Sequence, residues 1–169
     1  MPDATGLELI AQELREQDAG GVLDTVFFRD SAALLVTPES VPATLEHLRS
    51  KGYGFLASVH GVDYFPEEPR FGVHYELLDM YEVDRMTVKV RVPLDAPNVP
   101  SVVEAWPTAD HQEREVYDMF GVIFDDHPDL RRILMPEDYQ GFPQRRDFPM
   151  GGEPVLFTHN ETSTPGWWK

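Results

Sequence analysis

Residues 106–149 read WPTADHQEREVYDMFGVIFDDHPDLRRILMPEDYQGFPQRRDFP, and the interpretation of the chain starts from this stretch. The spacing predicts a helix over residues 108–120 that begins at a threonine N-cap and stops before a glycine. Apolar side chains recur on one face of this helix, at Val116, Met119 and Phe120. We therefore expect it to pack on a core.

The segment from about residue 125 onward is rich in proline, arginine and turn residues. It has too little apolar periodicity to fold alone, so residues 125–169 are predicted to be an extended arm that lies on another surface. Its arginines carry planar groups that suit bidentate capture of carboxylates, on this chain or on a neighbour: Arg131, Arg132, Arg145 and Arg146. The alternative is an arm surrounded by solvent.

Glu113 lies at the edge of the apolar face of the helix, because Glu113, Tyr117 and Phe120 are spaced at i, i+4 and i+7. A carboxylate there is costly unless it is paired. Two interpretations stay open: a rim position beside Arg114 and solvent, or a pair formed across a contact between subunits. Arg114 is also spaced to pair with Asp118, which stabilises an exposed helix by only about 0.3 to 0.5 kcal/mol.

The elements expected before residue 106 are a helix over 5–16 with a capping box at Thr5, strands 22–28 and 32–36, a helix capped by Thr37 or Ser40 and stopped by Gly52, a strand over 53–60, paired strands 71–78 and 85–92, and a short helix over 101–106 with a capping box at Ser101. This order predicts an α+β domain over residues 1–124. We expect an open mixed or antiparallel sheet with its helices packed on one face.

The strand at 85–92 is one-sided. Apolar residues alternate along it with Arg85, Thr87, Lys89 and Arg91. The pattern predicts an apolar side toward the core and a cationic side away from it, which is able to meet acidic groups elsewhere.

The composition limits the partners. With 14 basic and 30 acidic residues, the net charge is −16, which disfavours nucleic acid and anionic membrane surfaces. The chain has no cysteine, so thiolate ligation of an iron-sulfur cluster is excluded. No apolar run is long enough to span a bilayer and no signal peptide is evident, so we expect a soluble, cytoplasmic type of chain that reaches a membrane only through partners.

Motifs for chemistry are few. No GxGxxG, Walker or GxSxG pattern is present. His111 and Glu115 are spaced at i, i+4 and could offer two metal ligands, but no third ligand with suitable spacing follows. His127 precedes a proline and is expected to orient a turn by hydrogen bonds. A stand-alone acidic metal-dependent enzyme and a free adaptor protein are the hypotheses that compete with the one below.

Three linked blocks carry a family resemblance: EREVYDMFG at 113–121, HPDLRRIL at 127–134 and GFPQRRDFP at 141–149. Together they resemble the signature of the 30 kDa subunit family of respiratory complex I, the proton-pumping NADH:quinone oxidoreductase, in which this protein is the C subunit. The match is dense over about 45 residues in order, and it is looser over the preceding hundred.

The resemblance implies a non-catalytic component of the peripheral arm of that complex, at the cytoplasmic face of the cell membrane. No cofactor is expected on this chain, and FMN and iron-sulfur clusters would lie on other subunits. The implied partners are the hydrogenase-like large subunit and the subunit that carries the terminal cluster. The residues expected at subunit interfaces are Glu113, Arg114, Glu115, Tyr117, Asp118, Phe120, His127, Arg131, Arg132, Arg145, Arg146 and Asp147.

The resemblance leaves the parent machine open. Similar subunits occur in ferredoxin-driven complexes, in complexes that use coenzyme F420 and in membrane-bound hydrogenases. The electron donor binds elsewhere, so this sequence does not identify it.

Overall fold

The computed structural model describes residues 4–29 and 31–149, and the last twenty residues of the predicted arm lie outside this range. Its elements are α1 (Ala4–Gln17), β1 (Val22–Phe28), β2 (Ser31–Val36), the 3-10 turn η1 (Pro38–Ser40), α2 (Val41–Ser50), β3 (Phe55–Asp63), β4 (Phe71–Asp79), β5 (Asp84–Val92), β6 (Asn98–Pro100), α3 (Ala109–Phe120) and β7 (Ile123–Asp125). This is the α+β order that the sequence predicts.

Five strands form one mixed sheet in the order β1-β2-β5-β4-β3. Neighbours are antiparallel except β2 and β5, which run parallel. Both predicted hairpins are confirmed, because β1 pairs with β2 and β4 with β5. The parallel step is possible since α2, β3 and β4 intervene between β2 and β5 in the chain.

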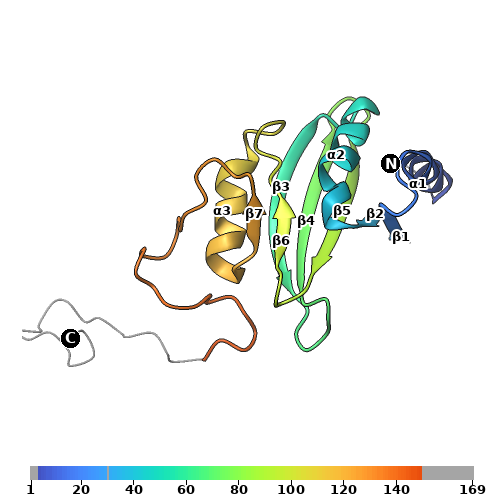
Figure 1. The fold of residues 1–169 in the computed structure, drawn as a ribbon. Helices are drawn as coiled ribbons and strands as arrows, with labels where there is room; N and C mark the ends of the chain where they lie inside the picture. The colour runs from blue at the N-terminus through green and yellow to red at the C-terminus, as the bar shows by residue number, and fades with distance from the viewer. Residues whose placement is uncertain (1–3, 30, 150–169) are drawn as a thin grey trace, which may run out of the picture.

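All three helices pack on one face of this sheet. Tyr75 of β4 lies beside Val88 of β5 and Val59 of β3, and only this alternating set of strand residues joins the hydrophobic core. The same core contains Leu7 of α1, with further residues of α2 and α3. The prediction of helices on one face is therefore confirmed, and the opposite face of the sheet is open (Figure 1).

The second, smaller sheet joins the two ends of the α3 segment. β6 precedes α3 and β7 follows it, and the two strands pair in parallel. The predicted helix over 101–106 is wrong, since these residues form turns. The reason is that Ser101 does not cap a helix: its hydroxyl donates to Glu113 of α3.

The helix starts also differ from the prediction. α1 begins at Ala4, so Thr5 lies inside its first turn. Thr108 occupies the N-cap position of α3 and Ser40 that of α2, but neither side chain makes a capping hydrogen bond. The predicted stops are confirmed, with φ of +109° at Gly52 and +78° at Gly121.

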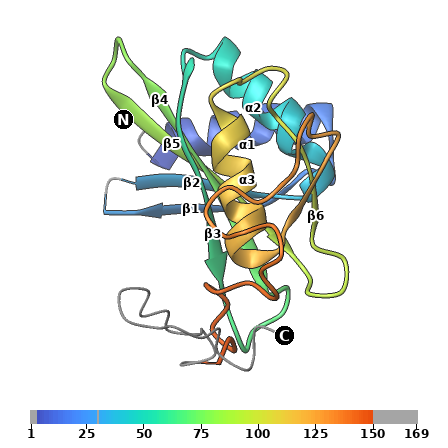
Figure 2. The ribbon, with the colours of Figure 1, turned by 90° about the vertical axis from the view of Figure 1, so that its left-hand side faces the viewer.

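The described part of the arm, residues 126–149, has no helix or strand of its own. In both views it runs beside α3, as the orange to red trace of Figures 1 and 2 shows. The surface on which this part lies is therefore the chain's own last helix.

Candidate functional site

Helix α3 lies close to the edge strand β3, and a glycine allows the approach. A Cβ on Gly61 would lie within 2.6 Å of two carbons of the Phe120 ring, so only glycine fits there without a shift of the ring. The backbone N–H of Val59 donates to the side-chain oxygen of Gln112. A helix side chain thus satisfies a backbone group at the edge strand.

Glu113 is fully buried between α3 and the turn after β6. One carboxylate oxygen accepts from the Ser101 hydroxyl at 2.7 Å, and the other from the Val102 N–H at 2.9 Å. The rim interpretation is wrong, because none of the side chain is exposed. Its hydrogen-bond partners belong to this chain.

Burial raises the pKa of Glu113 to about 7, because removal from water disfavours the carboxylate. The hydrogen bonds from Val102 and Ser101 oppose the rise, and the nearby charge of Asp110 adds to it. Tyr75 shares this part of the core. Its pKa is also raised, by burial and by Glu113, and among the described residues its hydroxyl finds no hydrogen-bond partner.

His127 connects the start of the arm to α3. Its Nδ1 accepts from the Asp129 N–H at 3.0 Å, which assigns the ring proton to Nε2. Nε2 then donates to the Asp110 carbonyl at 3.3 Å and lies 3.9 Å from Glu113. The side chain is fully buried, and the expected role of His127 as an orienting group in a turn is confirmed.

Asp118 anchors the arm to the helix. Its Oδ2 accepts the backbone N–H groups of Ile133, Leu134 and Met135 at 3.1, 2.8 and 2.8 Å. Its Oδ1 accepts from Arg132 at 2.6 Å. The carboxylate is fully buried, and four donors from one short segment converge on it.

These donors also set the ionisation of the anchor. Burial alone would raise the pKa of Asp118, but the hydrogen bonds from Met135, Arg132 and the other backbone groups hold it below its ordinary value. The predicted pair of Arg114 with Asp118 is wrong. Arg114 donates to the carbonyls of Arg131 and Arg132 instead, so it holds the same segment from the other side.

Arginines of the arm are stacked on aromatic rings. The guanidinium of Arg145 lies 4.3 Å from the centroid of Phe142 and 4.8 Å from that of Phe71, and its Nε donates to the Phe120 carbonyl at 2.7 Å. Arg132 lies 5.3 Å from the centroid of Phe142. One aromatic ring of the arm therefore separates two cations that are each held by α3.

A second clasp holds the end of the described arm. Arg70, which is 3% exposed, donates to both oxygens of Asp63 and both oxygens of Asp147 at 2.6 to 2.9 Å. The backbone N–H of Arg146 donates to Asp63 as well. Burial alone would raise the pKa of Asp63, but the bonds from Arg70, Arg146 and Phe65 lower it to about 2.

The twelve predicted interface residues thus divide into two sets. Buried side chains that hold the arm from within are Glu113, Asp118, Phe120 and His127. Partly or largely exposed residues are Arg114, Glu115, Tyr117, Arg131, Arg132, Arg145, Arg146 and Asp147. Contact of any of these with another subunit stays a prediction.

Sequence reasoning missed Arg70, Asp63 and Ser101. The first two lie far from the arm in sequence, and no local spacing relates them to Asp147. Ser101 was interpreted as a helix cap, although its spacing to Glu113 joins two segments rather than one. The RRD run at 145–147 was the available signal, since its acid needs a cation from elsewhere.

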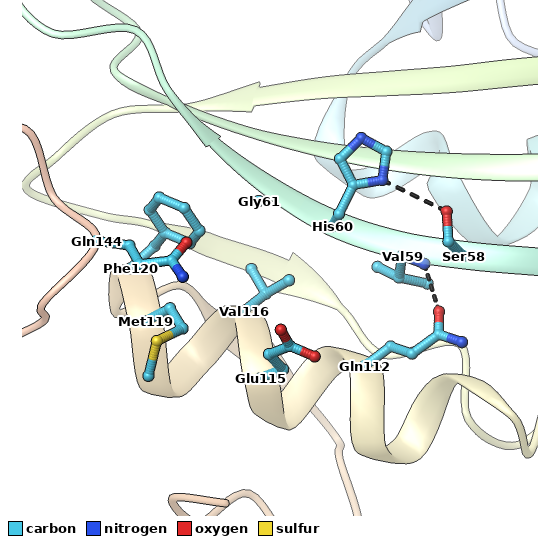
Figure 3. A pocket seen from close by; sticks show the side chains of 10 residues that line it. All are labelled: Ser58, Val59, His60, Gly61, Gln112, Glu115, Val116, Met119, Phe120 and Gln144. Carbon is cyan, nitrogen blue, oxygen red and sulfur yellow. Dashed lines mark hydrogen bonds between the residues drawn. The ribbon is translucent and has the colours of Figure 1, made fainter. Parts of the chain in front are cut away.

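A groove of about 290 Å³ runs between β3 and α3, with Val116 and Phe120 of the helix facing the strand (Figure 3). Ser58 Oγ lies 3.4 Å from His60 Nδ1 at its rim, yet no carboxylate among the described residues hydrogen-bonds to this histidine. Across the described part of the chain, no three His, Cys, Asp or Glu residues are grouped to hold a metal ion. His111 and Glu115 gain no third ligand there.

Fold and site define a class of small α+β protein in which an arginine-rich arm is clamped onto the last helix by buried carboxylates. Comparison with known proteins gives the family. The model of the respiratory-chain NADH dehydrogenase 30 kDa subunit matches residues 34–154. The chain belongs to this family.

Two relatives show the extent of the similarity. The chain is 41% identical over 155 residues to the C subunit of the NADH-quinone oxidoreductase of a Roseiflexus species, covering 90% of this chain and 89% of the relative. It is 42% identical over 130 residues to NADH-quinone oxidoreductase subunit 5 of Thermus thermophilus, covering 72% of this chain and 63% of the relative.

Solved structures agree in fold. A trypsin-resistant fragment (1–134) of Nqo5 superposes with a TM-score of 0.62 at 33% identity, covering 73% of this chain and 98% of the fragment. A chain of the membrane-bound sulfane sulfur reductase, an archaeal respiratory membrane complex, gives 0.70 at 24% identity over 85% of both chains. At that identity the likeness is one of fold alone.

Proposed function

We propose that this chain is a non-catalytic component of the peripheral arm of a proton-pumping NADH:quinone oxidoreductase. The observation that carries the proposal is the Asp118 anchor within the family signature. Four donors converge on one buried carboxylate to fix the backbone of residues 132–135. The most densely bonded group of the site therefore holds a segment in place.

The fixed segment presents apolar side chains outward. Ile133 and Leu134 are 37% and 59% exposed, although their backbone N–H groups are bonded to Asp118. Apolar side chains on an ordered backbone bind a partner at low entropic cost. We assign these two residues, with the exposed Arg131 and Arg146 nearby in the arm, to contacts with the hydrogenase-like large subunit, and the globular part to the terminal-cluster subunit.

In this proposal electrons pass from NADH through FMN and iron-sulfur clusters on other subunits to a quinone. A chain without cysteine contributes assembly and geometry instead. Among the described residues no helix is long and apolar enough to cross a bilayer. We place the chain at the cytoplasmic face of the membrane, held there by its partners.

The test is purification of the tagged chain from gently solubilised membranes, followed by identification of partners and an assay of NADH-dependent quinone reduction. We expect the terminal-cluster and hydrogenase-like subunits to co-purify with activity. Leu134→Asp should lower the recovery of the hydrogenase-like large subunit at least tenfold. Leu9→Asp is a matched control, because Leu9 of α1 is 58% exposed and lies away from the arm.

Equal recovery of the large subunit with both variants would contradict the assignment of the arm. The same partners without NADH activity would favour the second candidate, a scaffold component of a ferredoxin-, F420- or hydrogen-linked relative. Recovery of the chain alone, with a bound metal, would favour the stand-alone enzyme.

A further inference from the structure

The open face of the sheet, opposite the helices, carries a cluster of basic side chains. We define the basic face by His60 of β3, His74 of β4, and Arg85, Lys89 and Arg91 of β5. These residues alternate with those that enter the core, so they point away from the helices.

The register of the strands brings these groups together. His60 pairs with His74, and His74 with Lys89, so three nitrogen-bearing side chains form a row across neighbouring strands. The two imidazole centroids are 5.2 Å apart. Along β5, Lys89 and Arg91 are about 7 Å apart and Arg85 lies about 13 Å from Lys89, from the rise of a strand.

The basic face is short of counter-charges in a chain that has an excess of them. Among the described residues, Arg85 and Lys89 form no ion pair, whereas Arg15, Arg49 and Lys51 on the helical side each contact a glutamate. This occurs although 30 acidic residues face 14 basic ones in the sequence.

The acids near the basic face do not neutralise it. Glu76 accepts from the Thr87 hydroxyl at 2.9 Å. Glu67 is 70% exposed and only 3.7 Å from Arg91. The Arg91 guanidinium stacks 4.2 Å from the Tyr64 ring, and its buried Nε has no hydrogen-bond partner among the described residues.

The ionisation of His74 agrees with a positive potential at this surface. Burial, then the charges of Lys89 and His60, lower its pKa to about 4. His74 is therefore neutral at pH 7, and Tyr64 and His74 are 3.1 Å apart through the phenol oxygen and Nε2. A bound carboxylate would act in the opposite direction on this imidazole.

We propose that the basic face docks an acidic segment of a partner protein, whose carboxylates pair with Arg85, Lys89 and Arg91. A short segment stays within about 8 to 10 Å of these cations, the range that salt leaves unscreened. A nucleic acid or an anionic membrane extends further and meets the charge of −16 on the chain as a whole. The proposal concerns the side of the sheet away from the arm and does not rest on the proposed function.

The first test uses the purified full chain and a fluorescent peptide of twelve glutamates at low ionic strength. We expect binding that weakens at least tenfold in the double variant Arg85→Glu/Lys89→Glu. The control Arg15→Glu/Arg49→Glu changes the net charge equally on the helical side, and it should bind as the unaltered chain does. The pKa of His74, followed by NMR, should rise when the peptide binds.

Three results would overturn the proposal: no binding of the peptide, equal loss in both double variants, or a His74 pKa that the peptide does not change. Tighter binding of single-stranded DNA or of phosphatidylserine vesicles at the same two residues would also overturn it in favour of that ligand.

The second test uses the protein within its assembled complex and a carbodiimide, which joins an amine to a carboxylate in direct contact. The chain has three lysines, Lys51, Lys89 and Lys169. Lys51 Nζ lies 2.6 Å from Glu13, so the link between these two residues is an internal control. We expect Lys89 to be linked to an acidic residue of another chain.

A Lys89 that is acetylated freely in the complex and forms no such link would mean that the face is unoccupied there. Failure of the chain to join a complex would refute the proposed function alone, because the peptide test would still decide the basic face.

Discussion

The sheet and the arm of this chain are held by different kinds of contact. In the sheet, a continuous core of buried aliphatic and aromatic side chains joins strands and helices. In the described arm, the fixed points are few: Asp118, Arg145 and the Arg70 clasp. A core spreads its stability over many small contacts, whereas the arm depends on individual charged groups.

The difference teaches where the chain is sensitive to substitution. One methylene lost from the core removes a small part of a large sum. One carboxylate lost at residue 118 leaves three backbone donors and a guanidinium without their acceptor. The following predictions test this contrast.

The largest effect is expected for Asp118→Ala. Removal of one member of a buried charged pair costs about 3 to 5 kcal/mol, and here the bonded arm should detach. Trypsin should then cleave after Arg131 and Arg132 much faster, while urea unfolding reports the lower stability. Asp138→Ala, at an exposed acid of the same arm, should leave both measurements unchanged. Unchanged cleavage of Asp118→Ala would break the contrast.

A pH-dependent effect is expected for Glu113→Gln. The pKa of about 7 in the folded chain exceeds the ordinary value of 4.5, so the folded state binds the proton more tightly. The free energy of unfolding should therefore fall as pH rises from 4.5 to 7, by up to about 3 kcal/mol at 1.36 kcal/mol per unit.

The glutamine variant should lack this slope. Asp118 acts in another window, since its lowered pKa makes it stabilising above its ordinary 3.8 and less so as pH falls below that value. Urea unfolding between pH 4.5 and 8 separates the two. The same slope in both proteins would show that Glu113 is charged in the fold.

A core substitution sharpens the other side of the comparison. Gly61→Ala would place a methyl group within 2.6 Å of two carbons of the Phe120 ring, and overpacking of this kind costs about 1 to 3 kcal/mol. Gly20→Ala is its control, because the nearest atom would be 3.8 Å away. Thermal unfolding should separate the variants, and equal melting temperatures would mean that the ring moves freely.

The smallest effect is expected for Asp147→Ala, about 1 to 2 kcal/mol. Its partner Arg70 is buried, but the Asp147 side chain is 47% exposed, so solvent weakens the pair. Hydrogen exchange should increase near residues 145–148. Asp129→Ala, which breaks the exposed pair with Arg131, should change stability by less than about 0.5 kcal/mol.

Much of the sheet could be predicted from the sequence. Alternation at 71–78 and 85–92 is a local signal, and it indicated both the pairing and the side that faces the core. The α3 helix followed from the spacing of Val116, Met119 and Phe120 and from the glycine stop.

The site could be predicted only in part, for a physical reason. Its bonds join groups far apart in the chain, such as Arg70 to Asp147, or use backbone N–H groups that any residue carries. No side-chain pattern marks such donors. The turn at 101–106 was mistaken for a helix because Ser101 satisfies a carboxylate twelve residues away rather than its own backbone.

The position of Asp118 also has a consequence for synthesis. The ribosome delivers α3 before residues 132–135, so a buried carboxylate waits for donors that have not yet been made. The last helix and the arm must then settle together, late in translation. A ribosome that pauses between the two would expose an unfinished site to chaperones and proteases.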